Sequence, residues 1–220
     1  MRAYAVWCIG LIAIVAPAHA AVVTYTNQAL WQAAASGITT IDFAGLTASG
    51  VATNYSATGV TVSGVHFSDT SWLYVADDTY FSPLYLGCVV ACLQGFPDSG
   101  GGILATLPAG TRAVGMFGFQ YGLSTVTLTA QLSSGEFITQ ALASQTSAFF
   151  GFTSTSDISS VTLKSVFNPS DSVNNQYPTI RQFEFGTGVV QSAPEPSTAP
   201  ILAGAMLAAG IALRKKRTRP

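Results

Sequence analysis

The chain has 220 residues, of which 49% are hydrophobic and only 9% are charged, and its formal net charge is −1. Five of its nine basic residues fall within the last seven positions, whereas residues 21–193 hold three basic and nine acidic residues, a formal charge of −6. This acidity argues against nucleic-acid binding, which needs clustered Lys and Arg, and it suits cations or neutral sugars better.

The N-terminus has the pattern of a secretory signal peptide. Arg2 is followed by an apolar run over residues 3–15 and then by a small-x-small cleavage pattern, AHA, at residues 18–20. Cleavage there would remove residues 1–20 and leave Ala21 as the first residue of the mature protein. The segment between this peptide and the tail is long enough for one domain with its own core.

The first predicted element of the mature chain is a short helix in the sequence TNQALWQAAASG, residues 26–37. Thr26 or Asn27 can cap its N-terminus, and Gly37 can end it. Its apolar stripe would consist of Leu30, Trp31 and Ala34. After this segment the hydrophobic residues recur at every second position.

Alternating hydrophobic residues then predict a series of strands, each with one buried and one solvated face. The clearest case is residues 125–132, and bulges are expected where Gly64 and Gly115 interrupt the alternation. Many short strands separated by turn sequences predict a mainly β fold, an antiparallel sandwich or jelly roll with one short N-terminal helix. The other predicted strands cover residues 39–43, 60–67, 103–107, 113–121, 137–142, 148–152, 158–167 and 180–185.

Residues 68–102 do not fit the strand pattern and are interpreted as a long aromatic insertion, where sandwich proteins often carry binding sites. Sugars present apolar C–H faces to flat rings and hydroxyls to carboxylates, which makes this region a candidate glycan-binding site. The candidate residues are Trp72, Tyr74, Tyr80, Tyr85, Asp77 and Asp78. The alternative is that these rings only cover one end of the sandwich.

The same region offers oxygen ligands that suit calcium. They belong to Asp69, Asp77, Asp78 and Asp98. The regular spacing of an EF-hand is absent, and solvated loop carboxylates are the alternative explanation. We predict no cofactor, and calcium bound at this loop is the alternative.

Cys88 and Cys92 are the only cysteines of the predicted mature chain. An exported protein meets an oxidising environment, so the CVVAC segment can close a disulfide, provided that its backbone is looped. The alternative is two free buried thiols. Two thiolates alone do not complete a tetrahedral metal shell.

Motifs that would indicate catalysis are absent: there is no Gly-x-Ser-x-Gly elbow, His-Glu-x-x-His helix or phosphate-binding loop. A glycoside hydrolase would need two carboxylates across a cleft. Glu136 follows a turn and Glu184 alternates with Phe183 and Phe185, so both are predicted to face solvent. His66 is interpreted as a surface or hydrogen-bonded residue of a strand. The sequence therefore predicts no catalytic residue and no enzymatic activity.

The C-terminus combines three elements in order: Pro194-Glu195-Pro196, an uncharged apolar segment over residues 199–213, and a basic cluster of Arg214, Lys215, Lys216 and Arg217. As a helix the apolar segment would be roughly 22 Å long, and snorkelling of the basic side chains can make up the difference from a bilayer core of roughly 30 Å. A basic end prefers the cytoplasmic side, which predicts a transmembrane helix with the rest of the chain outside. The alternatives are a stiff solvated linker at the Pro-Glu-Pro sequence and an apolar tail or core helix after it.

This tail resembles the PEP-CTERM sorting signal of Gram-negative bacteria. The resemblance implies export, transient anchoring in the inner membrane, and processing by an exosortase at or near Pro194-Glu195-Pro196. It also implies a final location at the cell surface or in the extracellular matrix, where such proteins accompany exopolysaccharide.

The mature segment is in addition similar to exported bacterial β-sandwich domains that commonly carry such tails, through the pieces IDFAG, GVTVSG, LPAGTRAVGMFGF and IRQFEFG. The similarity implies a lectin-like or jelly-roll fold. Where many of those domains carry acidic residues this chain has Ala44 and Arg181, so a calcium site of that kind is not expected.

The sequence thus predicts a signal peptide (1–20), a β-sandwich domain (21–190) and a sorting and anchor segment (191–220). The predicted function is that of an exported, non-enzymatic surface or matrix protein associated with exopolysaccharide. A carbohydrate-binding module that uses residues 68–102 is the alternative, and a glycoside hydrolase ranks third.

Overall fold

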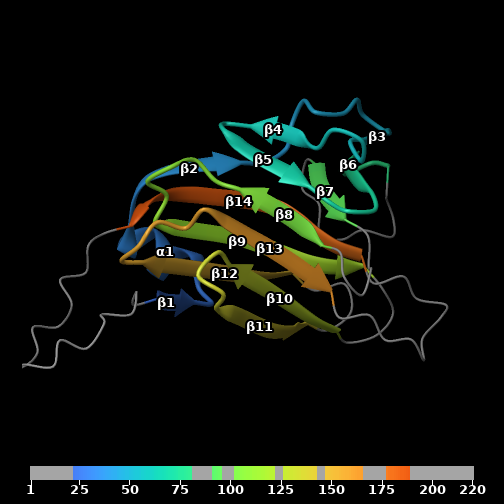
Figure 1. The fold of residues 1–220 in the computed structure, drawn as a ribbon. Coiled ribbons are helices and arrows are strands. Elements are labelled where there is room, and N and C mark those ends of the chain that lie inside the picture. Colours follow the sequence, from blue (N-terminus) through green and yellow to red (C-terminus); the bar gives the residue numbers. More distant parts are fainter. Residues whose placement is uncertain are drawn as a thin grey trace, which may run out of the picture.

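The structure is a computed structural model, and it describes residues 22–80, 91–95, 102–121, 126–142, 147–165 and 177–188. These residues form one helix and fourteen strands, and all paired strands are antiparallel. The prediction of a mainly β, antiparallel fold with one short helix is therefore confirmed. Figure 1 shows the strands in two layers that lie one over the other.

The larger layer, sheet A, has eight strands in the order β1-β12-β9-β14-β7-β6-β3, with β2 also pairing with β14. The long strand β14 (Tyr177–Gly188) pairs along one side with β9 (Ala113–Tyr121) and shares its other side between β7 (Ala91–Gly95) and β2 (Ala35–Ile41). The remaining strands are β1 (Val22–Tyr25), β12 (Ser147–Ser154), β6 (Leu73–Asp77) and β3 (Ala52–Asn54).

The smaller layer, sheet B, has six strands in the order β11-β10-β13-β8-β5-β4. In that order they are Phe137–Leu142, Val126–Leu132, Ser160–Ser165, Ile103–Thr106, Val65–Ser68 and Val60–Val62. Strands that are neighbours in this sheet are often far apart in the chain, because the chain crosses repeatedly between the two sheets.

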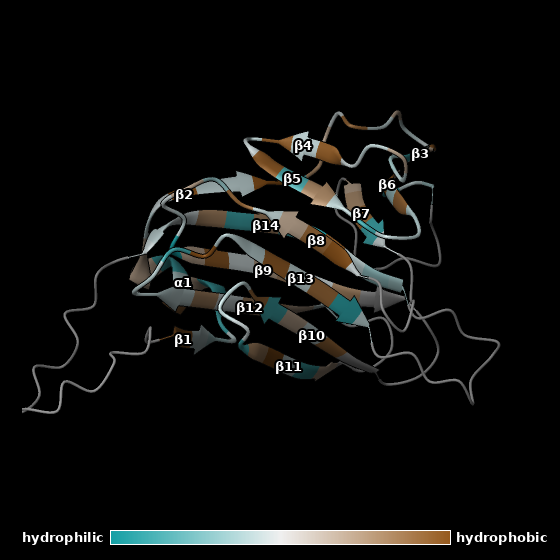
Figure 2. Ribbon diagram, in the orientation of Figure 1, coloured by the Kyte–Doolittle hydropathy of each residue, from teal (hydrophilic) through white to brown (hydrophobic). Residues whose placement is uncertain are grey.

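The hydrophobic core lies between the sheets and takes residues from both. In β13, Val161 and Leu163 are buried in it, whereas Thr162 and Lys164 between and beyond them are partly exposed. Residues of β14 such as Phe183 belong to the same buried cluster. Figure 2 shows this alternation as hydrophobic and hydrophilic segments that succeed one another along the strands. Two sheets that share one core make a sandwich-like architecture.

The helix α1 (Gln28–Ala34) packs on the outer face of sheet A, mainly through Trp31. Asn27 caps it as predicted, because its side-chain oxygen accepts a hydrogen bond from the backbone N–H of Leu30 at 3.1 Å. The predicted end at Gly37 is wrong, since β2 begins directly after the helix. The predicted apolar stripe is also wrong at Leu30, which is 65% exposed.

Neither predicted bulge is present. Residues 60–67 form a hairpin of β4 and β5 instead of one strand, and Ser63 and Gly64, with φ of 49° and 83°, make its two-residue turn. Gly115 lies in a regular part of β9. The irregularity occurs on the neighbouring strand, where the register of β14 against β9 shifts between Ile180 and Gln182.

The interpretation of residues 68–102 as an insertion outside the strand pattern is wrong in its described parts. Leu73–Asp77 and Ala91–Gly95 form β6 and β7, which pair with each other and belong to sheet A. The alternation was obscured because all five residues of β7 are buried, so that no solvated face marks the strand.

The two ends of the chain, with the predicted signal peptide over 1–20 and the predicted transmembrane segment over 199–213, lie outside the described residues. Within the part of the chain that the structure describes, no helix has the length and hydrophobicity to cross a membrane.

Candidate functional site

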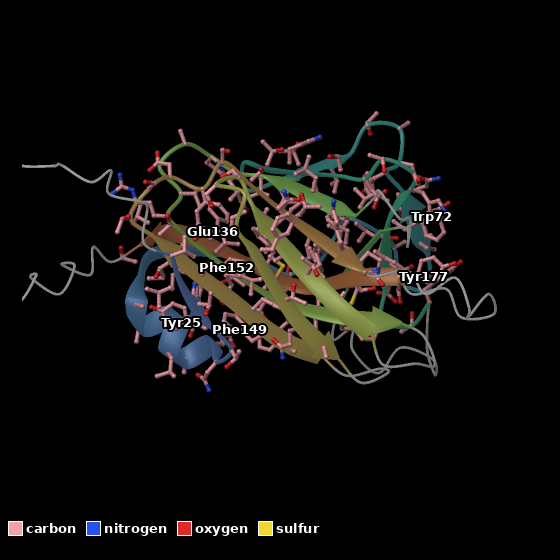
Figure 3. The ribbon with its side chains drawn as sticks, turned by 60° about the horizontal axis from the view of Figure 1, so that its bottom comes forward. Tyr25, Trp72, Glu136, Phe149, Phe152 and Tyr177 are labelled. Carbon is pink, nitrogen blue, oxygen red and sulfur yellow. The ribbon has the colours of Figure 1, made fainter. Side chains whose placement is uncertain are left out.

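Three aromatic side chains meet on sheet A, and Figure 3 shows two of them, Trp72 and Tyr177, at the end of the sandwich that is remote from α1. Trp72 precedes β6, Tyr74 lies within it, and Tyr177 begins β14. The Trp72 ring meets Tyr74 edge-on, with centroids 4.7 Å apart, and lies 5.3 Å from the Tyr177 ring at an interplanar angle of 33°. All three residues are partly exposed. We call Trp72, Tyr74 and Tyr177 the aromatic cluster.

The strand register explains why Tyr74 points away from the core. Leu73 and Val75 on either side of it are fully buried between the sheets, so Tyr74 projects from the outer face of sheet A. Directly opposite it are Asn54 on β3 and Gln94 on β7. Asn54 is exposed and Gln94 is 3% exposed, so the exposure of the side chains falls along this row from β3 to β7.

The Tyr74 hydroxyl is held in place and still has a free hydrogen-bonding function among the described residues. Its oxygen accepts a hydrogen bond from Asn54 Nδ2 at 3.1 Å. A phenol can accept and donate at once, so the hydroxyl proton of Tyr74 is available to an acceptor on a ligand. The cluster therefore offers flat rings and an oriented donor side by side.

Only two of the six predicted glycan-binding residues belong to this cluster. Asp77 lies at the opposite end of β6, roughly 10 Å from Tyr74 along the strand, and Asp78 and Tyr80 follow it. Tyr80 is 50% exposed, and Tyr85 lies outside the described residues. The structure thus separates Trp72 and Tyr74 from the other described candidates.

Asp77 serves as an acceptor in the turn that follows β6. It accepts hydrogen bonds from the hydroxyl of Thr79, from the backbone N–H of Thr79 at 2.9 Å, and from the backbone N–H of Gly50 at 3.0 Å. These bonds, led by that of the Thr79 hydroxyl, lower the pKa of Asp77 to about 2. The carboxylate is therefore ionised near neutral pH and ties the turn to the segment before β3.

The predicted metal and disulfide residues are only partly described. Within the described ranges, no three His, Cys, Asp or Glu side chains gather in a way that could hold a metal ion, and Asp98 lies outside these ranges. Cys92 is buried in β7 and is disulfide-bonded. Cys88 lies outside the described residues, so the Cys88–Cys92 pairing stays a prediction.

The two carboxylates considered for glycoside hydrolysis lie on different sheets. Glu136 is exposed in the turn before β11 and accepts a hydrogen bond from the Ser134 hydroxyl at 3.1 Å. The prediction that Glu184 faces solvent is wrong, since it is only 2% exposed on the outer face of sheet A, where Gln28 and Gln32 of α1 reach it. His66 is half-buried in β5 and its Nδ1 forms a hydrogen bond with the Thr61 hydroxyl at 2.9 Å, as the strand interpretation predicted.

Sequence reasoning missed Tyr177, Asn54 and Gln94. Tyr177 is about a hundred residues from Trp72 in the chain, and only the pairing of β14 with β7 and of β7 with β6 brings the two together. In the sequence, Asn54 lies between two runs of turn-forming residues. That position does not identify it as a binding residue.

Pro194, Glu195 and Pro196 of the sorting motif and the basic cluster of Arg214, Lys215, Lys216 and Arg217 lie outside the described residues. In comparisons with known proteins, no family model matches the chain and no curated protein is detectably similar to it.

Proposed function

We propose that the chain is an exported, non-enzymatic protein of the cell surface or extracellular matrix, and that its sandwich domain binds polysaccharide through the aromatic cluster. The observation that carries the binding proposal is the meeting of Trp72, Tyr74 and Tyr177 on the outer face of sheet A. We further assign the domain to the jelly-roll class, since its chain alternates between two antiparallel sheets of eight and six strands.

The chemistry of the cluster fits a sugar. The C–H faces of a pyranose ring pack on aromatic rings, and its hydroxyls need directed hydrogen-bonding partners. Trp72 and Tyr177 supply the rings, and the Tyr74 hydroxyl, fixed by Asn54, supplies a donor. The formal charge of −6 over residues 21–193 favours a neutral or cationic polysaccharide over one rich in uronic acids.

Replacing Trp72 with alanine is expected to weaken polysaccharide binding about tenfold, which corresponds to a loss of about 1.4 kcal/mol. The reason is that Trp72 contacts both other rings of the cluster, so its removal takes away one ring together with its contacts to the other two. The measurement is affinity electrophoresis of the purified full-length protein against cellulose derivatives, chitosan and alginate, with alginate expected to bind least.

The matched control is Phe137→Ala, which removes an aromatic side chain that is 62% exposed on β11 of the other sheet. This variant should bind as the wild type does. Equal binding by the Trp72 variant would contradict the proposed surface, and release of reducing sugars from any of the polysaccharides would contradict a non-enzymatic role.

The export proposal is supported by the two ends of the sequence, where a signal peptide pattern and a tail resembling a PEP-CTERM signal enclose the domain. In a Gram-negative host that has an exosortase, we expect the secreted chain to begin at Ala21 and to end near Pro194. Exosortase would be its processing partner, and the inner membrane its transient location. The measurement is the intact mass of the protein recovered from the culture medium.

Replacing Pro194, Glu195 and Pro196 together with alanine should leave the chain in the membrane fraction, because the processing site is lost while the apolar segment and basic cluster are kept. As a control, alanine at Ser192 and at Thr198, which flank the motif, should not change release. Recovery of an uncut chain from the cytosol, with both ends intact, would refute the export proposal.

A further inference from the structure

The strand β11 forms an open edge of sheet B. It pairs with β10 on one side, and among the described residues no strand pairs with its other side. Figure 1 shows it at the lower margin of its layer. Its register with β10 runs without interruption from Phe137 to Leu142. An open edge of this kind offers a row of unpaired backbone groups to another strand.

Other strands at the margins of the two sheets are protected in ways that β11 is not. The strands β1, β3 and β4 have only four, three and three residues. The pairing of β2 with β14 contains a register shift, and Gly37 in β2 has a φ of 60°. Short length and an irregular backbone both limit pairing with a further strand. In contrast, the six residues of β11, FITQAL, include no charged residue and no proline, and their pairing has no irregularity.

The hairpin that joins β10 to β11 shows which backbone groups face the open side. The N–H of Leu132 donates to the carbonyl of Glu136 at 2.8 Å, so these two residues form a hydrogen-bonded pair. Such pairs alternate with non-bonded pairs along an antiparallel ladder, so the even-numbered residues of β11 bond to β10. The odd-numbered residues therefore direct their N–H and C=O groups outward. They are Phe137, Thr139 and Ala141, and all three are exposed.

We propose that β11 pairs antiparallel with β11 of a second copy of this chain, about a two-fold axis at Thr139. In this register Thr139 lies opposite Thr139 of the other copy, and Phe137 lies opposite Ala141. These are the residues with outward backbone groups, so every outward N–H of one copy meets an outward C=O of the other. The two copies of sheet B then join into one continuous sheet.

The side chains of β11 match each other in this register. Phe137 is 62% exposed, and the small side chain of Ala141 opposite it leaves room for the ring. Glu136, next to the strand, comes opposite Leu142, so no like charges meet. A slip of two residues in either direction would leave one outward residue of each copy without a partner in the strand. A second copy is favoured over an unrelated strand because the same six residues supply both sides of the match.

The expected dimer is weak. A contact made by one pair of strands belongs to the small class of interfaces, so we expect a dissociation constant of about 10–100 µM. The chain is then monomeric at concentrations of about 1 µM, where Phe137→Ala serves as a control for polysaccharide binding and for unfolding.

The test is sedimentation equilibrium of the purified full-length protein from about 5 to about 500 µM, in a mild detergent that covers the apolar residues 199–213. Thr139→Lys and Thr139→Glu each place two like charges opposite each other at the axis. Each variant alone should dimerise at least about tenfold more weakly than the wild type. An equimolar mixture of the two should regain dimerisation, because the introduced lysine of one copy then faces the introduced glutamate of the other.

The matched controls are Thr106→Lys and Thr106→Glu, which make the same charge changes at an exposed residue of β8, in the interior of the same sheet. Each should dimerise as the wild type does, and mixing them should change nothing. A wild-type chain that stays monomeric up to about 500 µM would overturn the proposal. So would undiminished association of Thr139→Lys alone, which would assign the contact to another surface such as the apolar ends. Growth beyond a dimer would also overturn it, since a two-fold pair occupies the open edge of both copies.

Discussion

Replacing Trp31 with alanine is expected to lower the free energy of unfolding by about 3–5 kcal/mol. Trp31 is fully buried, its ring packs against Phe149 with centroids 5.9 Å apart, and its indole N–H donates to the carbonyl of Phe152 at 3.1 Å. The strands beneath it carry Gly115 and Gly151 directly opposite each other. A Cβ at Gly151 would lie 2.7 Å from Trp31, so the sheet is shaped to receive this ring.

The measurement is urea denaturation followed by circular dichroism, and the control lies on the same helix. Leu30→Ala removes a neighbouring apolar side chain that is 65% exposed, and it should change the free energy of unfolding by no more than about 0.5 kcal/mol. If the two variants lost the same stability, the helix would not be anchored through Trp31, and the closure of α1 over Glu184 would lose its main support.

The strand pattern of the sequence predicted most strands of the two sheets, but it missed β1, β3, β6 and β7 and the irregular positions. Residues 137–142 coincide with β11, because alternation there is unbroken. In β14 the buried residues Ile180 and Phe183 are three positions apart, followed by Phe185 two positions later, and this change of spacing was the available sign of the register shift. The positions expected to be irregular were Gly64 and Gly115 instead. Gly64 serves a turn, which the Ser63-Gly64 pair between two apolar runs indicates, whereas Gly115 makes room for Trp31 and Phe149, a role that does not follow from the local sequence.

The candidate site and the environment of Glu184 were less predictable because both depend on contacts across the sheet. Alternation with Phe183 and Phe185 correctly places Glu184 on the face away from the core, but only tertiary structure puts α1 over that face. In the same way, the richness of residues 68–102 in aromatic side chains singled out Trp72 and Tyr74. The third ring of the cluster, Tyr177, comes from a different strand of sheet A.

The two sheets are joined by a line of three aromatic rings. Phe67 on β5 of sheet B lies 5.3 Å from Phe43 and 5.2 Å from Phe183 on β14 of sheet A, with both pairs arranged edge to face. Phe43 follows β2 and is 1% exposed with a φ of 60°, a backbone conformation that non-glycine residues rarely adopt. The contact with Phe67 helps to offset the cost of that conformation.

Phe67→Ala is therefore expected to lower the free energy of unfolding by about 3–5 kcal/mol, through the cavity it leaves and the loss of both ring contacts. Denaturant unfolding measures the loss, with Phe137→Ala as the control. Phe137 is 62% exposed on β11 at the edge of the same sheet, so its removal should cost no more than about 0.5 kcal/mol. A loss at Phe67 as small as that at Phe137 would mean that the two sheets do not share a tightly packed core at this point, and the sandwich would then need another explanation for its cohesion.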